Sequence, residues 1–226
     1  FGFNPGSELA ADNAVTPVAV TTVLAAAAGA VIAAGLSWVT AKKPDVSMTG
    51  NGLLGGLVAI TAGCGAVNNW SAVLIGVIGG ALVFYAVPFF DRIRIDDPVG
   101  AVAVHGVAGA WGVVAVGLFA REDVEGFWSQ GLLFGGGTEQ LFGQLLGLVA
   151  IAGFVGVTMT VVFLALKHTM GLRVSETEEV EGLDVHEHGY PGYGESIGIG
   201  APAPSVQGVA AATAAVAGSP SPAVGK

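Results

Sequence analysis

IDDPVGAVAVHGVAGAWGVVAVGLFA, residues 95–120, is the stretch that decides the fold. It is apolar over a length that crosses the ~30 Å hydrocarbon core of a bilayer at ~1.5 Å of helical rise per residue. Asp97 followed by Pro98 is typical of an N-cap and a first helical position, because proline lacks only an N–H group that would be unsatisfied there. The stretch therefore predicts a membrane-spanning helix that starts at this pair.

His105 is the one ionisable side chain between Pro98 and Ala120. It lies eight residues after Asp97, roughly 12 Å along a helix, which predicts a place near the bilayer midplane. An ionisable group there is costly unless it faces a bundle interior or a water-lined path. A hydrogen bond between helices is the alternative role, but the membrane setting favours a functional one. The small residues expected on its face are Ala101, Ala108, Gly109 and Gly112.

Composition places the whole chain among polytopic membrane proteins. Of its 226 residues 53% are hydrophobic and 11% are charged, against about 25% charged in ordinary globular domains. The net charge of −9 argues against a nucleic-acid partner, which would need clustered Lys and Arg. Cys64 is the single cysteine, so no disulfide forms within the chain. The start at FGFNPGS, without a Met, leads us to expect a piece of a longer protein.

Charged and turn-forming residues divide the apolar runs into five predicted spans. Two glycine pairs, Gly76/Gly80 and Gly143/Gly147, have the spacing typical of close helix packing in membranes. Asn68–Ser71 supplies the turn between the second and third spans. The predicted spans are residues 13–41, 53–67, 72–90, 95–120 and 140–166.

The basic residues predict the orientation. When successive loops are assigned alternately to the two sides of the membrane, every basic residue from Lys42 to Arg173 except Arg121 falls on the same side. The positive-inside rule makes that side cytoplasmic, so the C-terminal segment is predicted to be inside. The residues on that side are Lys42, Lys43, Arg92, Arg94, Lys167 and Arg173.

Four regions follow from this division. Residues 1–7 are expected to end a truncated helix, and residues 8–167 to form the transmembrane bundle. Residues 168–196 are polar and acidic and are expected to be a cytoplasmic regulatory region. Residues 197–226, rich in Ala, Pro and Gly, are expected to be disordered. A metal site at His186 and His188 is the less favoured reading of that acidic region.

Four blocks of the sequence, taken together and in this order, resemble the second half of an ammonium transporter of the Amt/Mep/Rh family. They are FGFNPGS (1–7), MTGNGLLGGLVAITAGC (48–64), IDDPVGAVAVHGVAGAWG (95–112) and GLRVSETEEVEGLDVHEHG (171–189). The resemblance covers nearly everything from Phe1 to about Tyr193.

The resemblance implies an all-α membrane bundle, the second inverted repeat plus the final helix of an eleven-helix subunit. Such subunits form homotrimers in the plasma membrane, each with its own pore. The implied activity is recruitment of ammonium and conduction of ammonia through a hydrophobic pore, with no cofactor and no enzymatic step. The implied partners are ammonium or ammonia, the lipid bilayer and a PII-type regulatory protein at the cytoplasmic face.

The family's motifs place roles on individual residues of this sequence. His105 would be one member of the histidine pair at the pore centre, where it could relay a proton. Phe3 would help to close the external gate, and Ser7 would help to hold ammonium at the outer recruitment site. Asp97 would be a structural helix cap near the pore. The residues expected to contact the regulator are Arg173, Gly182, Asp184 and His188.

Three alternatives stay open at the level of sequence. An ammonium sensor of the same family would be favoured by a fused signalling module, and the sequence after residue 167 contains none that we identify. An unrelated small-solute channel would be favoured by several charges within the spans, and His105 stands alone there. A chain that lacks half of each pore could also be inactive by itself. An enzyme is disfavoured because no nucleophile elbow, phosphate loop or membrane-depth carboxylate pair is present.

Overall fold

The computed structural model describes residues 1–122 and 129–190. Helices joined by turns and loops make up this part of the chain, and it contains no strand. The chain divides into two units, residues 1–158 and residues 159–226. The tail at 197–226 that was expected to be disordered lies outside the described residues. The helices are α1 (Phe3–Gly6), α2 (Val15–Ala41), α3 (Val46–Thr61), α4 (Asn69–Arg92), η1 (Val102–Val107), α5 (Ala108–Phe119), η2 (Leu132–Phe134), α6 (Glu139–Thr169), α7 (Glu176–Glu181) and α8 (Leu183–His188).

Four helical segments are long and apolar enough to cross a membrane: α2, α4, the continuous Val102–Phe119 segment, and α6. They coincide with four of the five predicted spans. The span predicted at 53–67 was placed too late, because α3 begins at Val46 and ends at Thr61 after only 16 residues. The Asp45 side chain accepts a hydrogen bond from the Met48 N–H at 2.7 Å, and this cap fixes the start of α3.

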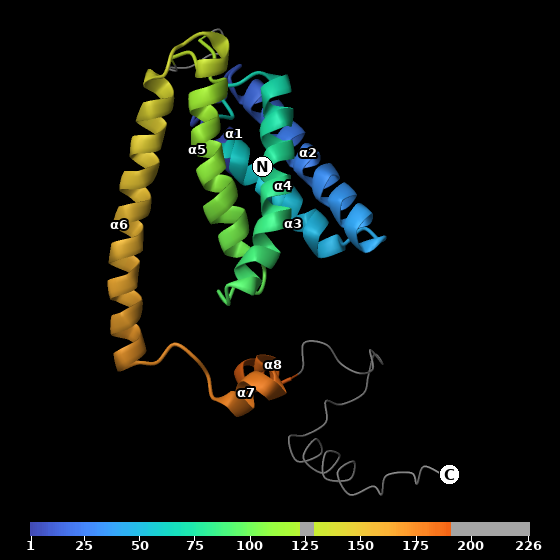
Figure 1. Ribbon diagram of the computed structural model, residues 1–226, viewed down its shortest axis with the longest axis vertical. Coiled ribbons are helices and arrows are strands. Elements are labelled where there is room, and N and C mark those ends of the chain that lie inside the picture. Colours follow the sequence, from blue (N-terminus) through green and yellow to red (C-terminus); the bar gives the residue numbers. More distant parts are fainter. Residues whose placement is uncertain (123–128, 191–226) are drawn as a thin grey trace, which may run out of the picture. The chain divides into compact units, whose positions relative to one another are not determined.

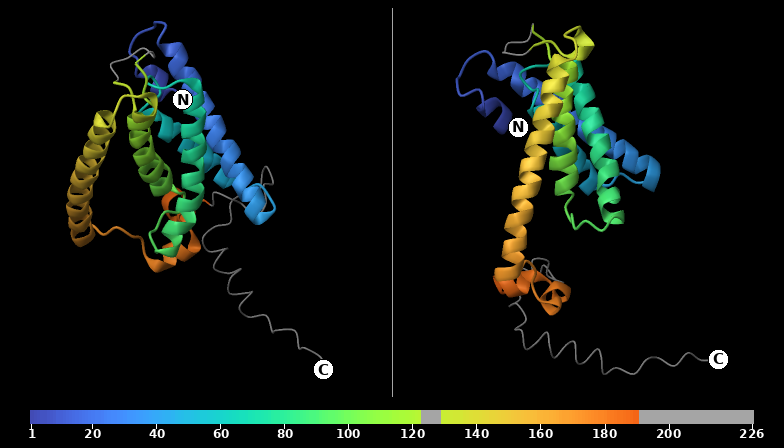
Figure 2. Two further views of the ribbon diagram at one scale, coloured as in Figure 1. Left: turned by 45° about the horizontal axis from the view of Figure 1, so that its top comes forward. Right: turned by 60° about the vertical axis from the view of Figure 1, so that its left-hand side comes forward.

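Glycines bring the backbones of α2, α3 and α4 into direct contact. These three helices lie side by side in every view (Figures 1 and 2). A Cβ atom on Gly76 would lie 2.6 Å from Ala25 Cα, and one on Gly80 would lie 2.7 Å from Gly29 Cα. The close packing predicted for Gly76/Gly80 is therefore confirmed, and α2 is the helix that both residues meet.

The remaining core lies where α5 and η1 pack against α3 and α4. Its buried side chains are small or medium in size, and Trp111 is half-buried beside them. The Trp111 indole N–H donates to the Ile75 carbonyl of α4 at 3.1 Å, which satisfies the indole inside an apolar interface.

The α6 helix differs from the other three membrane-length helices because none of its residues is buried among the described residues. Its first turn meets α5, where a Cβ on Gly117 would lie 2.6 Å from Leu141 Cα. Beyond that turn, no described atom lies within 4 Å of a Cβ built on Gly143 or Gly147. The close packing predicted for this pair does not occur within the described part of the chain.

Candidate functional site

The His105 segment begins with a turn at residues 97–100. The Gly100 N–H donates to the Asp97 carbonyl at 3.0 Å, and Gly100 has a φ of +76° that favours glycine. The helix starts only at Ala101, so the prediction that Asp97 and Pro98 are the N-cap and first helical position was wrong. The turn places both residues outside the helix.

Asp97 reaches the helix through its side chain instead. Its carboxylate is buried, with the residue 8% exposed, and Oδ2 accepts from the N–H groups of Val102 at 3.0 Å and Ala103 at 3.3 Å. These N–H groups belong to the first helical turn, where no helical carbonyl is available to them. The side-chain oxygen therefore satisfies two N–H groups at the positive end of the helix dipole.

The segment that carries His105 is a π-helix rather than the regular α-helix that the sequence predicted. It spans Val102–Val107, and the Ala108 N–H donates to the Ala103 carbonyl, five residues back. Wide turns of this kind are rare and occur frequently at functional sites. His105 lies four residues after the helix start at Ala101, roughly 6 Å by helical rise. The estimate of 12 Å assumed a helix from Asp97 onward, and the turn at residues 97–100 contradicts that assumption.

His105 is exposed, whereas Ala103, Val104 and Ala108 around it are fully buried. The small residues expected on the histidine's face lie partly elsewhere. Ala108 is buried, and a Cβ on Gly112 would lie 3.1 Å from Ala59 Cα of α3. Because the π-turn changes the angular position of each residue that follows it, His105 is separated from this packed surface.

Phe3 and Ser7 lie at the ends of α1, which is tied to α2 by a buried asparagine. Asn4 is 6% exposed and its Nδ2 donates to Thr22 Oγ1 at 3.2 Å. The Ser7 hydroxyl donates to the Phe3 carbonyl at 2.6 Å, and Phe3 itself is 75% exposed. Asn4 was not singled out from the sequence, although a polar residue in the apolar FGFN stretch is a signal that could have found it.

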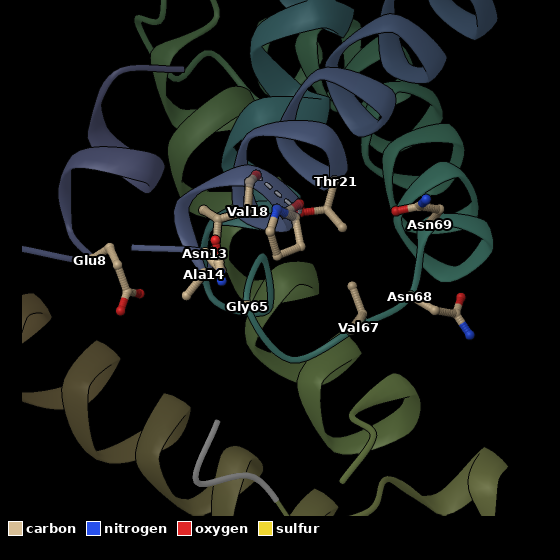
Figure 3. A pocket seen from close by; sticks show the side chains of 10 residues that line it. Glu8, Asn13, Ala14, Val18, Thr21, Gly65, Val67, Asn68 and Asn69 are labelled. Atoms are coloured by element: carbon tan, nitrogen blue, oxygen red, sulfur yellow. Dashed lines mark hydrogen bonds between the residues drawn. The ribbon is translucent and has the colours of Figure 1, made fainter. Parts of the chain in front are cut away.

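A cavity of about 470 Å³ opens beside α1, between the start of α2 and the start of α4 (Figure 3). Glu8 and Asn68 lie on opposite sides of it, so the carboxylate and the amides do not converge on one point. Neither Phe3 nor Ser7 is among its lining residues. The Thr21 hydroxyl at its wall donates to the Cys64 carbonyl at 2.7 Å, which joins α2 to the turn after α3.

The residues expected to contact a regulator lie in the second unit and are exposed. Arg173 pairs with Glu179 at 3.5 Å. Gly182 has a φ of +93° and ends α7, Asp184 lies in the first turn of α8, and His188 is its last residue. In the described residues no three His, Cys, Asp or Glu side chains form a group that could hold a metal ion.

A capping box begins α7 and lowers the pKa of Glu178. The Ser175 hydroxyl donates to Glu178 Oε2 at 2.7 Å and the Ser175 N–H donates to the same oxygen at 2.8 Å; the hydroxyl is the larger cause of the shift. Since the pKa in the folded state is depressed, the box stabilises α7 above the ordinary glutamate pKa and is lost as the pH falls through the lowered value. It is therefore fully formed at neutral pH.

We expect Ser175→Ala to raise the pKa of Glu178 toward its ordinary value, because the substitution removes the hydroxyl donor. A carboxyl titration by NMR on protein labelled with ¹³C-glutamate measures this shift. Thr177→Ala is the matched control, since Thr177 takes no part in the capping box, and it should leave the Glu178 titration unchanged. An unaltered titration in Ser175→Ala would show that the hydroxyl does not stabilise the carboxylate.

Comparison with known proteins identifies the family. The model of the Ammonium Transporter Family matches residues 1–193. This chain belongs to the ammonium transporter family. It is 42% identical over 199 residues to ammonium transporter Amt2 of Archaeoglobus fulgidus, which covers 85% of the chain and 42% of the relative. It is 43% identical over 186 residues to ammonium transporter Amt1 of Haloferax mediterranei, covering 82% of the chain and 34% of that relative.

Solved ammonium transporter structures share the fold. A structure described as a sensor Amt protein is 38% identical with a TM-score of 0.71, over 83% of this chain and 45% of that one. Candida albicans Mep2 is 29% identical with a TM-score of 0.72, over 78% and 40%. The chain thus spans less than half the length of the relatives it matches. Its family and its apolar helices support a multi-pass membrane protein.

Proposed function

We propose that the complete protein recruits ammonium at the outer face of the plasma membrane and conducts ammonia through a hydrophobic pore. The observation that carries the proposal is His105, an exposed imidazole that is the only ionisable side chain on the apolar helical segment from Val102 to Phe119. An intramembrane ionisable residue that does not pack into its own bundle is best explained by a pathway that it lines.

The difference between ammonium and ammonia gives the mechanism. A cation at the bilayer centre costs about 3 kcal/mol on insertion scales, whereas the neutral molecule has no such penalty. An apolar pore therefore favours the deprotonated form, and a proton must be left behind or carried separately. An imidazole can accept or donate a proton near neutral pH, so His105 is suited to hold the conducted nitrogen and to relay the proton.

The outer residues fit the recruitment step. The Ser7 hydroxyl hydrogen is engaged by the Phe3 carbonyl, and the oxygen keeps acceptor lone pairs for the N–H groups of ammonium. The exposed Phe3 ring can attract the cation through its face, which contributes about 0.5–1 kcal/mol at exposed sites. Together they distinguish a cation with N–H donors from Na⁺ or neutral solutes before the pore is entered.

The proposal includes a homotrimer with cytoplasmic C-termini and a PII-type partner. The support for assembly is α6, a 31-residue apolar helix with no residue buried in its own chain, which needs lipid or other helices around it. The support for a regulator is the exposed set Arg173, Gly182, Asp184 and His188, which lies beyond the last span. The basic residues that flank α2, α4 and α6 favour the cytoplasm for that end.

An ammonium sensor is the second candidate. It is favoured by the likeness to the structure described as a sensor Amt protein, which is 38% identical to this chain. A sensor would bind ammonium at the same outer site but conduct little of it. The family assignment disfavours the third candidate, an unrelated solute channel, and it also favours a conduit over an enzyme.

The test uses the full-length protein in proteoliposomes. An inward ammonium gradient should change the luminal pH faster in proteoliposomes than in protein-free liposomes, where ammonia crosses the lipid unaided, and an equal potassium gradient should produce no such change. Binding of ammonium without flux would support the sensor instead. Neither binding nor flux would refute the proposal.

A further inference from the structure

Two side chains replace a backbone hydrogen bond at the start of the His105 helix. In an α-helix that continued through this point, the Ala103 N–H would donate to the Val99 carbonyl, four residues back. Here Asp97 Oδ2 accepts from the Ala103 N–H at 3.3 Å, and the Val99 carbonyl accepts from Asn51 Nδ2 at 3.2 Å. Both halves of the missing bond are therefore satisfied, each by a different side chain.

Asn51 comes from α3, so it anchors the turn to a second helix. A Cβ on Gly100 would lie 2.8 Å from Asn51 Nδ2 and 3.1 Å from Val87 Cγ2 of α4. The amide therefore sits directly over the one residue of the turn that has no side chain. The positive φ of Gly100 and this close approach both require glycine.

Packing alone leaves this turn room to move. A cavity of about 670 Å³ adjoins it, lined by Asn51, Val99 and Gly100 among others. Well-packed interiors hold their parts by contact on all sides, which the turn lacks on the cavity side. The Asn51 hydrogen bond and the Asp97 carboxylate are thus the directional restraints on where the helix begins.

We propose that Asn51 is a positioning residue. It fixes where His105 lies along its helix axis and the direction in which the side chain points around that axis. It acts through the Val99 carbonyl, and His105 follows Gly100 by five residues of helix. The transport arm of this inference rests on the proposed function, whereas the positional arm does not. The sequence signal is again an asparagine inside a charge-free apolar run, MTGNGLLGG.

Asn51→Asp in the full-length protein tests the proposal. The carboxylate keeps the shape of the amide but loses its N–H donors and repels the Val99 carbonyl. In lipid bilayers with ¹⁵N-labelled histidine, we expect the His105 imidazole signals in solid-state NMR spectra to shift, with His105→Ala identifying them. We also expect ammonium flux to fall about tenfold, in keeping with the cost of a small displacement at a functional group.

Ser47→Asp is the matched control, because Ser47 lines the same cavity and the variant adds the same charge one helical turn before Asn51. It should change neither the His105 signals nor the flux. Equal effects of the two variants would assign the change to charge at the cavity and would overturn the proposal. Unshifted His105 signals in a folded Asn51→Asp protein would overturn it as well.

A second variant keeps the test decisive if Asn51→Asp does not fold. Gly100→Ala adds a methyl group where the Asn51 amide lies and strains the turn, so it should displace the same hydrogen bond and shift the same signals. If the wild-type protein conducts no ammonium but either variant shifts the His105 signals, the proposed function fails and the positioning role stands. If neither variant shifts them, the positioning role fails whatever the flux shows.

Discussion

Replacing His105 by alanine in the full-length protein is expected to abolish ammonium conduction while the protein remains folded. His105 is exposed and contributes nothing to the buried core around Val104 and Ala108, so its removal leaves the packing intact. A positioned group that transfers protons contributes about 10²–10⁴-fold to a rate. We therefore expect the protein-dependent part of the initial rate of the luminal pH change in proteoliposomes to fall at least ~100-fold.

His168→Ala is the control for this experiment. His168 is exposed at the end of α6, and the proposed mechanism gives it no role. The ammonium flux through the His168→Ala protein should therefore equal that through the wild type. The melting temperatures of both variants in detergent should match the wild-type value. An unchanged ammonium rate and an unchanged selectivity against potassium in His105→Ala would refute the proposed role of His105.

Gly76→Ala is expected to destabilise the protein although the same change usually stabilises a helix. Alanine is more favourable than glycine within a helix by about 1 kcal/mol. At Gly76, however, the added methyl group would meet the backbone of α2, 2.6 Å from Ala25 Cα. A side chain could relieve this clash by changing its rotamer, but backbone atoms cannot, so α2 and α4 must move apart. We expect a net loss of about 2 kcal/mol, since overpacking typically costs 1–3 kcal/mol.

Gly35→Ala is the matched comparison for Gly76→Ala. Gly35 lies within α2, and no described atom is within 4 Å of a Cβ built on it. At Gly35 the higher helix propensity of alanine is not offset by a steric clash, so the melting temperature should stay level or rise. Thermal unfolding in detergent, followed by tryptophan fluorescence, compares the two. Equal and small effects would show that the α2–α4 contact can relax at little cost.

The apolar spans could be predicted because length and hydropathy alone specify them, and α2, α4 and α6 lie where expected. Their ends depend on single capping side chains, which are harder to weigh. Asp45 starts α3 at Val46, but the uncharged run that follows obscured this start in the sequence. Gly100 delays the next helix to Ala101 because a positive φ interrupts the helical backbone. The Asp97–Pro98 pair carried no sign of that delay.

The candidate site was predicted only in part for a related reason. His105 is conspicuous because it is ionisable in an apolar stretch. Asn4 and Asn51 were missed because their importance lies in partners far away in sequence, Thr22 and Val99. Such contacts follow from how helices pack. The periodicity of one helix does not contain that information, and it also gave no sign of the π-turn.

The π-turn at Val102–Val107 has a consequence for insertions and deletions. It holds one residue more than an α-helical turn requires. Loss of one residue between Gly100 and His105 would let an unbroken α-helix join the capped turn to α5, with every residue from Ala108 onward still packed as before. His105 would instead turn around the helix axis, because residues of a π-turn are wound less tightly than those of an α-helix. A shortened chain could thus keep the contacts of α5 while its imidazole faces another direction, so the extra residue of the π-turn sets the direction of His105.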